Sequence, residues 1–335
     1  MSDIRFCQIN EYNILQKFIN DDWKSGHILS KNKTLLDFQH LNVEENRYNF
    51  VVAYNSKENI FDAILGFIPL DQFDKDLKHT KNIWLAIWKK TDRCRVDNTL
   101  GLDLLSFLED QLHPNAIAAI GINTNVQKIY KMLKYETGTL KQFYYANPKH
   151  KNQLIIEKPI NSAPSKVNSS CQLRLMQRIN NIEHLFTCIN PQKSPAYFYN
   201  RYLKHPFYKY EIYEVWQEQH IVAAFVIRKV YVQSSNALRI VDYAGDLSKI
   251  GNITDQLLKL LEKENSEYVD FICSKCDEVA VRNLGLIETS NDTIVPNYFE
   301  PFLKQNIPIL YAYKGVYRDY HMVKGDSDQD RPNQI

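Results

Sequence analysis

Glycine is scarce in this sequence, and long apolar runs are missing. Ten glycines stand against 21 tyrosines and 16 phenylalanines. This balance favours strand-rich walls and pockets suited to sugars or flat rings, or equally aromatics that simply fill two cores. No run of about eighteen apolar residues occurs, so we expect no membrane-spanning helix. The start, MSDIRFCQINEYNILQ, lacks an apolar stretch after a basic segment, so we expect a cytoplasmic protein without a secretory signal.

An excess of charge of either sign is also lacking. Lys and Arg number 41 and Asp and Glu 39, for a net charge of +2. A near-neutral chain has no general attraction for nucleic acid, so nucleic acid is not an expected partner. The six cysteines are scattered, and Cys273 and Cys276 form the single C-x-x-C pair. With no second pair and no nearby histidine, we expect reduced thiols and no metal site.

The length of 335 residues suits two domains of about 150 residues each. A segment rich in Pro, Asn, Ser and Lys runs from Asn147 to Ser170 and includes one short predicted strand at Leu154–Ile156. The sequence therefore predicts four parts: a first domain over 1–147, a linker over 148–170, a second domain over 171–320, and an exposed polar tail over 321–335.

Hydrophobic periodicity predicts the same order of elements in both halves. In the first half we expect helices at 11–20, 35–40, 100–112 and 125–135, and strands at 48–55, 61–70, 82–90, 116–122 and 139–147. One face of the 100–112 helix carries Leu102, Leu105, Leu108 and Leu112. In the second half we expect strands at 208–217, 220–232, 237–245, 268–273 and 307–314, with helices at 253–265 and 277–286. The expected class is α/β, with a mixed sheet in each half.

The segment from Ile83 to Tyr135 contains the most informative pattern. A polar loop follows the 82–90 strand and leads to a helix whose first turn contains Gly101. A helix start with a nearby glycine offers backbone N–H groups and a positive dipole end, which suits a pyrophosphate. A simple turn from strand to helix would carry the same pattern.

At this point the sequence resembles the GNAT superfamily of N-acyltransferases. Their Q/R-x-x-G-x-G/A pyrophosphate loop is matched by Asn98, Thr99, Leu100, Gly101, Leu102 and Asp103, and their Y-x-x-L-G-F helix end by Tyr130 to Tyr135. Three positions depart from the family pattern: Asn98 replaces Gln or Arg, Asp103 replaces a small residue, and Lys134 replaces glycine. The resemblance implies two tandem GNAT-like domains, of which the second lacks the pyrophosphate loop and is degenerate.

The resemblance also implies a cofactor, acetyl-CoA or another acyl-CoA. The residues implied to bind it are Ala86, Ile87 and Trp88 on the bulged strand, then Asn98, Thr99, Leu100, Gly101 and Leu102, and finally Asn125. A backbone N–H near Ala86–Trp88 would stabilise the oxyanion. Tyr130 would protonate the departing thiolate, or alternatively serve only as a core tyrosine.

The acceptor would be held by the loop between the first two helices. We expect Trp23, Asp37 and Gln39 to contact it, with His27 as the candidate general base because its usual pKa suits an ammonium. A histidine in a loop can equally be structural. In the second half we expect substrate contacts from Arg201, His205, Tyr208, Asp242 and Tyr243, although this aromatic-rich stretch could instead be packed core.

The whole chain resembles tandem GNAT proteins associated with surface-polysaccharide biosynthesis, on phrases such as GFIPLDQFD, IWLAIWK, HPFYKY and GDSDQDRPN. This implies N-acylation, with acetyl as the expected group, of a nucleotide-linked amino sugar. Two alternatives stay open. One is a FemAB-like transferase using aminoacyl-tRNA, which the absence of Lys/Arg clusters disfavours. The other is a non-catalytic sugar- or nucleotide-binding protein, which the three departures favour. The oligomeric state is not predicted.

Overall fold

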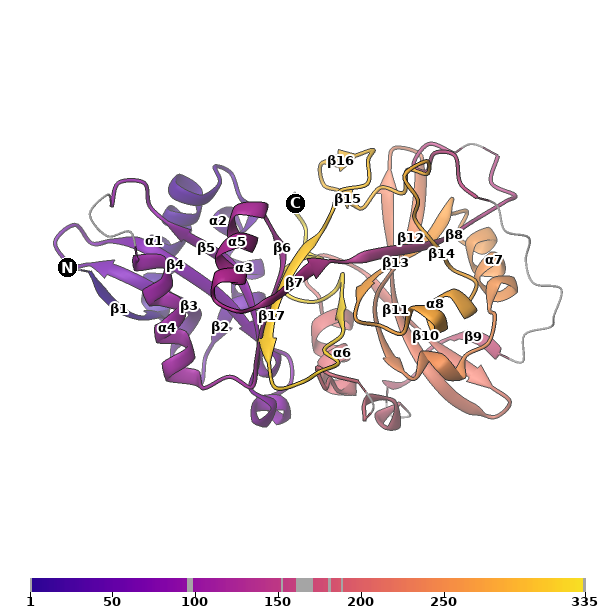
Figure 1. Ribbon diagram of the computed structural model, residues 1–335, viewed down its shortest axis with the longest axis horizontal. Coiled ribbons are helices and arrows are strands. Elements are labelled where there is room, and N and C mark those ends of the chain that lie inside the picture. The colour runs from indigo at the N-terminus through magenta and orange to yellow at the C-terminus, as the bar shows by residue number, and fades with distance from the viewer. Residues whose placement is uncertain are drawn as a thin grey trace. The chain divides into compact units, whose positions relative to one another are not determined.

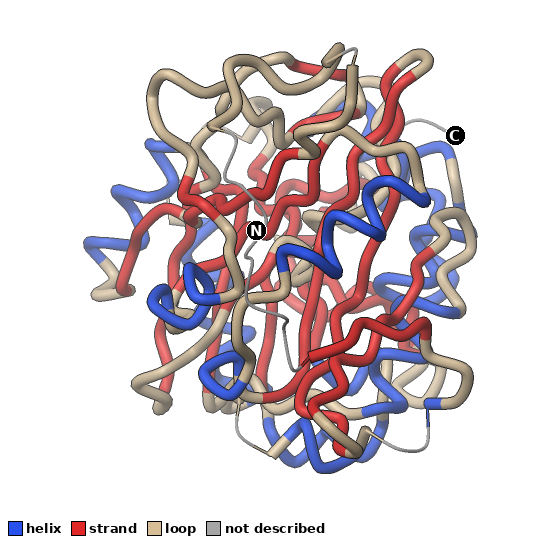
Figure 2. The backbone as a smooth tube through the Cα atoms, turned by 90° about the vertical axis from the view of Figure 1, so that its right-hand side faces the viewer, coloured by secondary structure: helices blue, strands red, loops and turns tan. Residues whose placement is uncertain are grey.

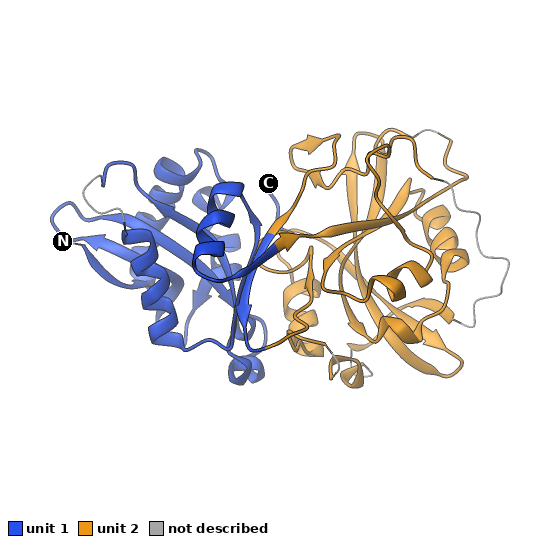
Figure 3. Cartoon of the chain, viewed as in Figure 1, with its two compact units in different colours: residues 1–137, 311–316, 331–335 blue, residues 138–310, 317–330 orange. Residues whose placement is uncertain are grey.

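The computed structural model describes residues 2–94, 99–151, 153–160, 171–179, 182–187 and 189–333. The chain separates into two compact units (Figure 3). Unit 1 consists of Met1–Thr137, Tyr311–Val316 and Arg331–Ile335, and unit 2 of Gly138–Leu310 and Tyr317–Asp330. Over the described residues, each unit is built on a mixed eight-stranded sheet. The predicted α/β class with two sheets is confirmed.

Unit 1 has the strand order β1-β3-β4-β5-β6-β17-β7, with β2 paired to β3 (Figure 1). Its strands are β1 (Asp3–Gln8), β2 (Leu41–Asn42), β3 (Arg47–Asn55), β4 (Ile60–Pro69), β5 (Asn82–Lys90), β6 (Ala116–Ile122), β7 (Glu136–Thr139) and β17 (Leu310–Gly315). Its α-helices are α1 (Tyr12–Phe18), α2 (Ile28–Lys31), α3 (Lys33–His40), α4 (Leu100–Leu112) and α5 (Thr124–Met132), and a π-helical turn η2 (Ile19–Trp23) follows α1.

Unit 2 has the strand order β14-β8-β13-β12-β11-β10-β9, with β18 also paired to β13. Its strands are β8 (Lys141–Ala146), β9 (Cys171–Leu175), β10 (Tyr210–Gln217), β11 (His220–Val232), β12 (Ser235–Gly245), β13 (Tyr268–Ser274), β14 (Ile287–Glu288) and β18 (Met322–Val323), with a separate hairpin of β15 (Tyr298–Phe299) and β16 (Phe302–Leu303). Its helices are α6 (Pro195–Phe198), the π-helical η7 (Tyr199–Leu203), α7 (Thr254–Lys263) and α8 (Glu278–Asn283).

The two units repeat one pattern of elements, whose strands and helices are labelled in Figure 1 and coloured by type in Figure 2. In unit 1, three antiparallel strands β3, β4 and β5 lead to helix α4, and the next strand, β6, pairs parallel with β5. In unit 2, strands β10, β11 and β12 lead to helix α7, and β13 pairs parallel with β12. A parallel pair needs such a helical crossover, so the shared pattern follows from the shared chain order.

Helix α4 packs one apolar stripe into the core of unit 1. Its buried residues are Leu100, Leu104, Leu105 and Leu108. The predicted stripe was therefore partly wrong, because Leu102 is 36% exposed. A spacing of four residues keeps Leu100, Leu104 and Leu108 on one side of a helix.

Two strands were assigned to the wrong half. The predicted strand 139–147 corresponds to β8, which pairs with β13 in the second sheet, and only Thr139 at its start belongs to β7 of the first sheet. The predicted strand 307–314 corresponds to β17, which lies between β6 and β7 in the first sheet. The units therefore exchange strands, which the spacing of apolar residues does not reveal.

Two polar segments also differ from expectation. The tail was predicted to be exposed, but Lys324, Asp326, Ser327 and Asp330 are buried. They are buried because ion pairs satisfy the charges: Asp326 contacts Lys193 at 2.8 Å and Asp330 contacts Arg228 at 2.8 Å.

The second segment is Leu154–Ile156, which forms no strand. Its three backbone N–H groups donate instead to the buried carboxylate of Glu267 at 2.7–3.1 Å. A carboxylate can satisfy several N–H donors at once, so these N–H groups need no neighbouring strand.

Among the described residues, no helix is both long and apolar enough to cross a bilayer.

Candidate functional site

Strand β5 carries a bulge at its middle. In the pairing with β4, Leu65 faces Trp88 and Phe67 faces Leu85. Ala86 and Ile87 therefore both oppose Gly66 alone. An extra residue of this kind leaves backbone groups outside the ladder and bends the strand. The bulge falls on Ala86–Trp88, the segment chosen from the sequence.

The same bulge ends the pairing between β5 and β6. The two strands pair in parallel from Asn82 with Ala116 to Leu85 with Ala119. Both strands then continue, to Lys90 and Ile122, without further pairing to each other, and no described strand lies between them there. We call the gap beyond Leu85 and Ala119 the first opening. Its β5 edge is formed by Ala86 to Trp88, which have no ladder partner on β6.

Helix α4 begins beside this bulge. The indole of Trp88 donates a hydrogen bond to the carbonyl of Gly101 at 3.0 Å, which joins the strand to the first turn of the helix. A Cβ on residue 101 would lie 3.4 Å from that indole, which is an ordinary van der Waals contact. Backbone N–H groups at a helix start attract anions.

Two departures from the family pattern fall at this helix start. Asp103 accepts a hydrogen bond from the hydroxyl of Thr99 at 3.1 Å, so its carboxylate faces the first turn of α4. Leu100 is buried and Leu102 partly exposed. Asn98, which was predicted to bind the cofactor, lies outside the described residues.

Tyr130 lies on α5 and is 1% exposed. Its ring is 5.5 Å from that of Trp88 and 4.8 Å from that of Tyr135. Burial raises the pKa of its hydroxyl above the usual value, which keeps the proton in place at neutral pH. The contact with Trp88 links Tyr130 to the bulged strand, and its burial in the core of unit 1 fits the alternative of a core tyrosine equally well.

The start of α5 is capped by Asn123. Its side-chain oxygen accepts from the backbone N–H groups of Asn125 and Val126 at 3.0 and 2.9 Å. Asn125, the predicted cofactor contact, is exposed at this turn. The capping role of Asn123 could have been recognised from the sequence, since asparagine before a helix is a common cap.

His27 caps another helix. Its Nδ1 lies 3.3 Å from the N–H of Leu29 in α2, and its Nε2 lies 2.9 Å from the guanidinium of Arg331. The ring is 5% exposed. His27 can therefore accept a substrate proton at Nε2 only when Arg331 moves away.

The other predicted acceptor residues of unit 1 differ in their surroundings. Trp23 is 42% exposed. Asp37 accepts hydrogen bonds from the hydroxyl of Tyr48 and from Lys33, both at 2.6 Å. Gln39 is 3% exposed, and its side-chain oxygen has no partner among the described residues. Of these three residues, Gln39 has a buried side-chain oxygen that could accept a hydrogen bond from a substrate.

The predicted residues of unit 2 hold this unit together. Arg201 is buried and donates to the carbonyls of Gly325 and Ser327. The Nδ1 of His205 accepts from the N–H groups of Phe207 and Tyr208 at 3.2 and 2.9 Å, and burial lowers its pKa to about 4. The hydroxyl of Tyr208 donates to Glu300 at 2.8 Å.

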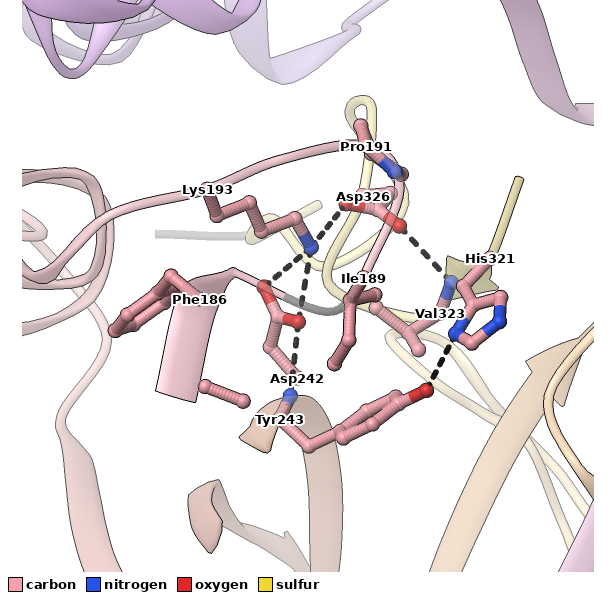
Figure 4. A pocket seen from close by; sticks show the side chains of 10 residues that line it. Phe186, Ile189, Pro191, Lys193, Asp242, Tyr243, His321, Val323 and Asp326 are labelled. Atoms are coloured by element: carbon pink, nitrogen blue, oxygen red, sulfur yellow. Dashed lines mark hydrogen bonds and ion pairs between the residues drawn. The ribbon is translucent and has the colours of Figure 1, made fainter. Parts of the chain in front are cut away.

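Asp242 and Tyr243 line a small cavity in unit 2 (Figure 4). Both carboxylate oxygens of Asp242 accept from the buried Lys193, at 2.8 and 2.7 Å. The hydroxyl of Tyr243 lies 2.6 Å from Nδ1 of His321. Lys193 and His321 were not predicted, since neither stands in a recognisable motif.

The described residues contain no group of three or more His, Cys, Asp and Glu side chains that could hold a metal ion. Within unit 1, the structure brings Trp88, Gly101 and Tyr130 together. In unit 2, Asp242 and Tyr243 line one cavity.

The fold matches known acyltransferase structures at low sequence identity. A GCN5-related N-acetyltransferase from Anabaena variabilis matches with a TM-score of 0.57 at 11% identity, over 94% of this chain and 73% of that one. A conserved protein from Enterococcus faecalis, described as a probable N-acyltransferase, matches with a TM-score of 0.53 at 7% identity, over 93% and 72%. No protein-family model and no curated protein matches the sequence. The chain therefore has the fold of the GCN5-related N-acetyltransferases, the GNAT fold.

Proposed function

We propose that this protein is an acyl-CoA-dependent N-acyltransferase, with acetyl-CoA as its donor. The observation that carries the proposal is the first opening, where the bulged β5 separates from β6 beside the start of α4. The finer proposal, which rests on the sequence resemblance, is that the acceptor is the amino group of a nucleotide-linked amino sugar used in surface glycan synthesis.

The residues around the first opening fit such a donor. The backbone of Ala86 to Trp88 is free of the β5–β6 ladder, so it can pair with the amide groups of a pantetheine arm. The start of α4, from Thr99 to Leu102, would hold the pyrophosphate through backbone N–H groups and the helix dipole. Asn125 would contact the cofactor at the start of α5.

When bound, acyl-CoA supplies a thioester whose carbonyl carbon forms a C–N bond with the acceptor amine while its C–S bond breaks. A backbone N–H of the bulge would stabilise the charge that develops on the carbonyl oxygen. Tyr130 would donate its phenolic proton to the sulfur that leaves. Its ring contact with Trp88 on the bulged strand supports this assignment.

His27 would take the proton that the acceptor ammonium loses. Because Arg331 lies 2.9 Å from Nε2 of His27, the acceptor would have to displace that guanidinium. Trp23, Asp37 and Gln39 would contact the acceptor, and the unpaired oxygen of Gln39 supports this for one of them. Arg201, Asp242 and Tyr243 are engaged in buried contacts, so we propose that they shape unit 2, and that the partly exposed His205 and Tyr208 offer aromatic surface to substrate.

Donor binding and acceptor choice need separate experiments. Saturating acetyl-CoA should raise the melting temperature, because a ligand at about 100 times its Kd stabilises by about 2.7 kcal/mol. Thiol release from acetyl-CoA should then identify the acceptor among nucleotide-linked amino sugars. Absence of any thermal shift would leave the FemAB-like and non-catalytic alternatives.

Replacing Tyr130 with Phe should test the proton donor. Tyr130→Phe removes the hydroxyl alone, and we expect kcat to fall by roughly 10²-fold or more with KM nearly unchanged. Tyr135→Phe is the matched control, because Tyr135 lies in the same aromatic cluster and its hydroxyl donates to Glu109 at 3.1 Å. An unchanged kcat in Tyr130→Phe would remove Tyr130 from the mechanism.

A further inference from the structure

Unit 2 repeats the geometry of the first opening. In the pairing of β11 with β12, Val226 faces Asp242 and Ile227 faces Ile240. Val241 is thus the extra residue of a bulge. The parallel pairing of β12 with β13 ends at Ile240 and Phe271, while both strands continue. We call the gap beyond this last pair the second opening.

The second opening is filled by the chain itself. Strand β18 pairs with β13 through Met322 and Val323, which face Ser274 and Cys273. On the other edge, the N–H of Gly325 donates to the carbonyl of Val241 at 2.7 Å. Between these contacts, the N–H of Lys324 donates to the carbonyl of Ile272 at 3.1 Å. Residues 322–325 therefore bond to both strands that border the gap, including the bulge residue itself.

Buried charges anchor the residues that follow this segment. Asp326 forms an ion pair with Lys193, which also binds Asp242 on β12 (Figure 4). Although burial disfavours a charged ammonium, the two carboxylates hold the pKa of Lys193 above its usual value. Arg201 donates to the carbonyls of Gly325 and Ser327. Removing one partner from such a buried set leaves an unpaired charge, so the segment is firmly held.

The fit is close at Gly325. A Cβ on this residue would lie 2.5 Å from the hydroxyl of Tyr202 and 2.6 Å from the carbonyl of Val241. Both distances are too short for any side chain, so glycine is required for this approach of backbone to backbone. The cavity that remains beside the segment has a volume of about 10 Å³, which leaves room for about one water molecule.

We infer that residues 322–325 are a built-in occupant of the second opening, in the place that the donor arm takes in the first. The comparison between the two places rests on the proposed function of unit 1. The consequence is that unit 2 is closed to acyl-CoA by its own C-terminal segment, and that each chain binds one donor molecule. Unit 2 would then differ from unit 1 in two ways: it lacks the pyrophosphate loop, and residues 322–325 fill the place of the donor arm.

Hydrogen exchange of the full-length chain tests the occupation without any ligand. The amides of Lys324 and Gly325 should exchange slowly, and Gly325→Ala should speed them by roughly tenfold or more, because the added Cβ expels the segment. Gly251→Ala is the control in the same unit, since a Cβ there meets no atom within 4 Å. Rapid exchange in the natural chain, or equal exchange in the two variants, would overturn the inference.

Equilibrium dialysis with labelled acetyl-CoA tests the closure. We expect one molecule per chain, with ligand-induced protection of peptides from β5 and none from β12 or β13. A second bound molecule that protects β12 and β13 would overturn the inference. If no acetyl-CoA binds, the proposed function of unit 1 fails, whereas slow exchange at Lys324 and Gly325 would still support the occupied second opening.

Discussion

Lys134 shows at the scale of one residue how the chain departs from the GNAT sequence pattern that it resembles. It follows α5 with a φ of +63°, in the left-handed region that favours glycine. The Y-x-x-L-G-F pattern places glycine at this position. The resemblance therefore identified a position where the backbone is left-handed, and where a side chain raises the free energy of that conformation.

We expect Lys134→Gly to stabilise the protein. A left-handed conformation costs a non-glycine residue about 1–2 kcal/mol, and the greater freedom of glycine in the unfolded chain offsets about 0.4–1 kcal/mol of this gain. The net effect should be about 0.5–1 kcal/mol in urea unfolding. Lys128→Gly, at an exposed position inside α5, should instead destabilise by about 1 kcal/mol. A loss of stability in both variants would refute the interpretation of Lys134.

His205 gives a second prediction, on pH. Burial lowers its pKa to about 4 from 6.5, and Nδ1 accepts two backbone hydrogen bonds that protonation would break. The folded state thus favours the neutral ring. Its contribution is present above pH 6.5 and is lost as the pH falls from 6.5 toward 4.

The free energy of unfolding should therefore fall by roughly 2 kcal/mol from pH 7 to pH 5 because of His205. His205→Asn keeps an acceptor for the two N–H groups but does not titrate, so its stability should fall less over this range. Urea unfolding of both proteins at the two pH values measures the difference. Parallel losses would show that other groups dominate.

Single residues were partly predictable. Gly101, Tyr130 and the Ala86–Trp88 segment fall on the expected elements because local spacing defines a strand, a turn and a helix. The bonding of His27 was not predictable, because its partner Arg331 is 304 residues away in the sequence. The same holds for Lys193 and Asp242, 49 residues apart.

Among the elements, the start of α4 matters most for the proposed donor site. Asp103 faces this start through Thr99. A carboxylate there interacts favourably with the positive end of the helix dipole, but it repels a phosphate.

Asp103→Asn should therefore bind acetyl-CoA more tightly, by about 0.5–1 kcal/mol or roughly two- to fivefold. Calorimetric titration at low salt measures this best, since salt screens the effect. Asp110→Asn, near the other end of the same helix, should leave the Kd unchanged. Equal affinities of Asp103→Asn and the natural chain would argue against a pyrophosphate at this turn.

Elements with strong periodicity were predicted well, and pairing partners were not. Strands β3 to β6 and helix α4 lie close to their expected bounds. Strand β1 was missed, and the strands predicted at 139–147 and 307–314 were assigned to the wrong sheet. An alternating pattern predicts a buried face, but it carries no information about which sheet supplies the neighbour.

For the whole molecule, the exchange of strands is the main feature that the sequence concealed. A contiguous division of the chain, with one sheet before and one after a linker, was the natural expectation. Instead β8 belongs to the second sheet and β17 to the first. The polar tail looked exposed because its composition is charged, yet its carboxylates pair with buried Lys193 and Arg228.

The central claim is that the first opening binds an acyl-CoA, and a crystal structure of the full chain with acetyl-CoA tests it most directly. We predict electron density for the pyrophosphate at the backbone of Thr99 to Leu102 and for the pantetheine arm along Ala86 to Trp88. Density for the cofactor elsewhere would contradict the account. So would a crystal soaked in saturating acetyl-CoA in which side chains cover the backbone of Thr99 to Leu102.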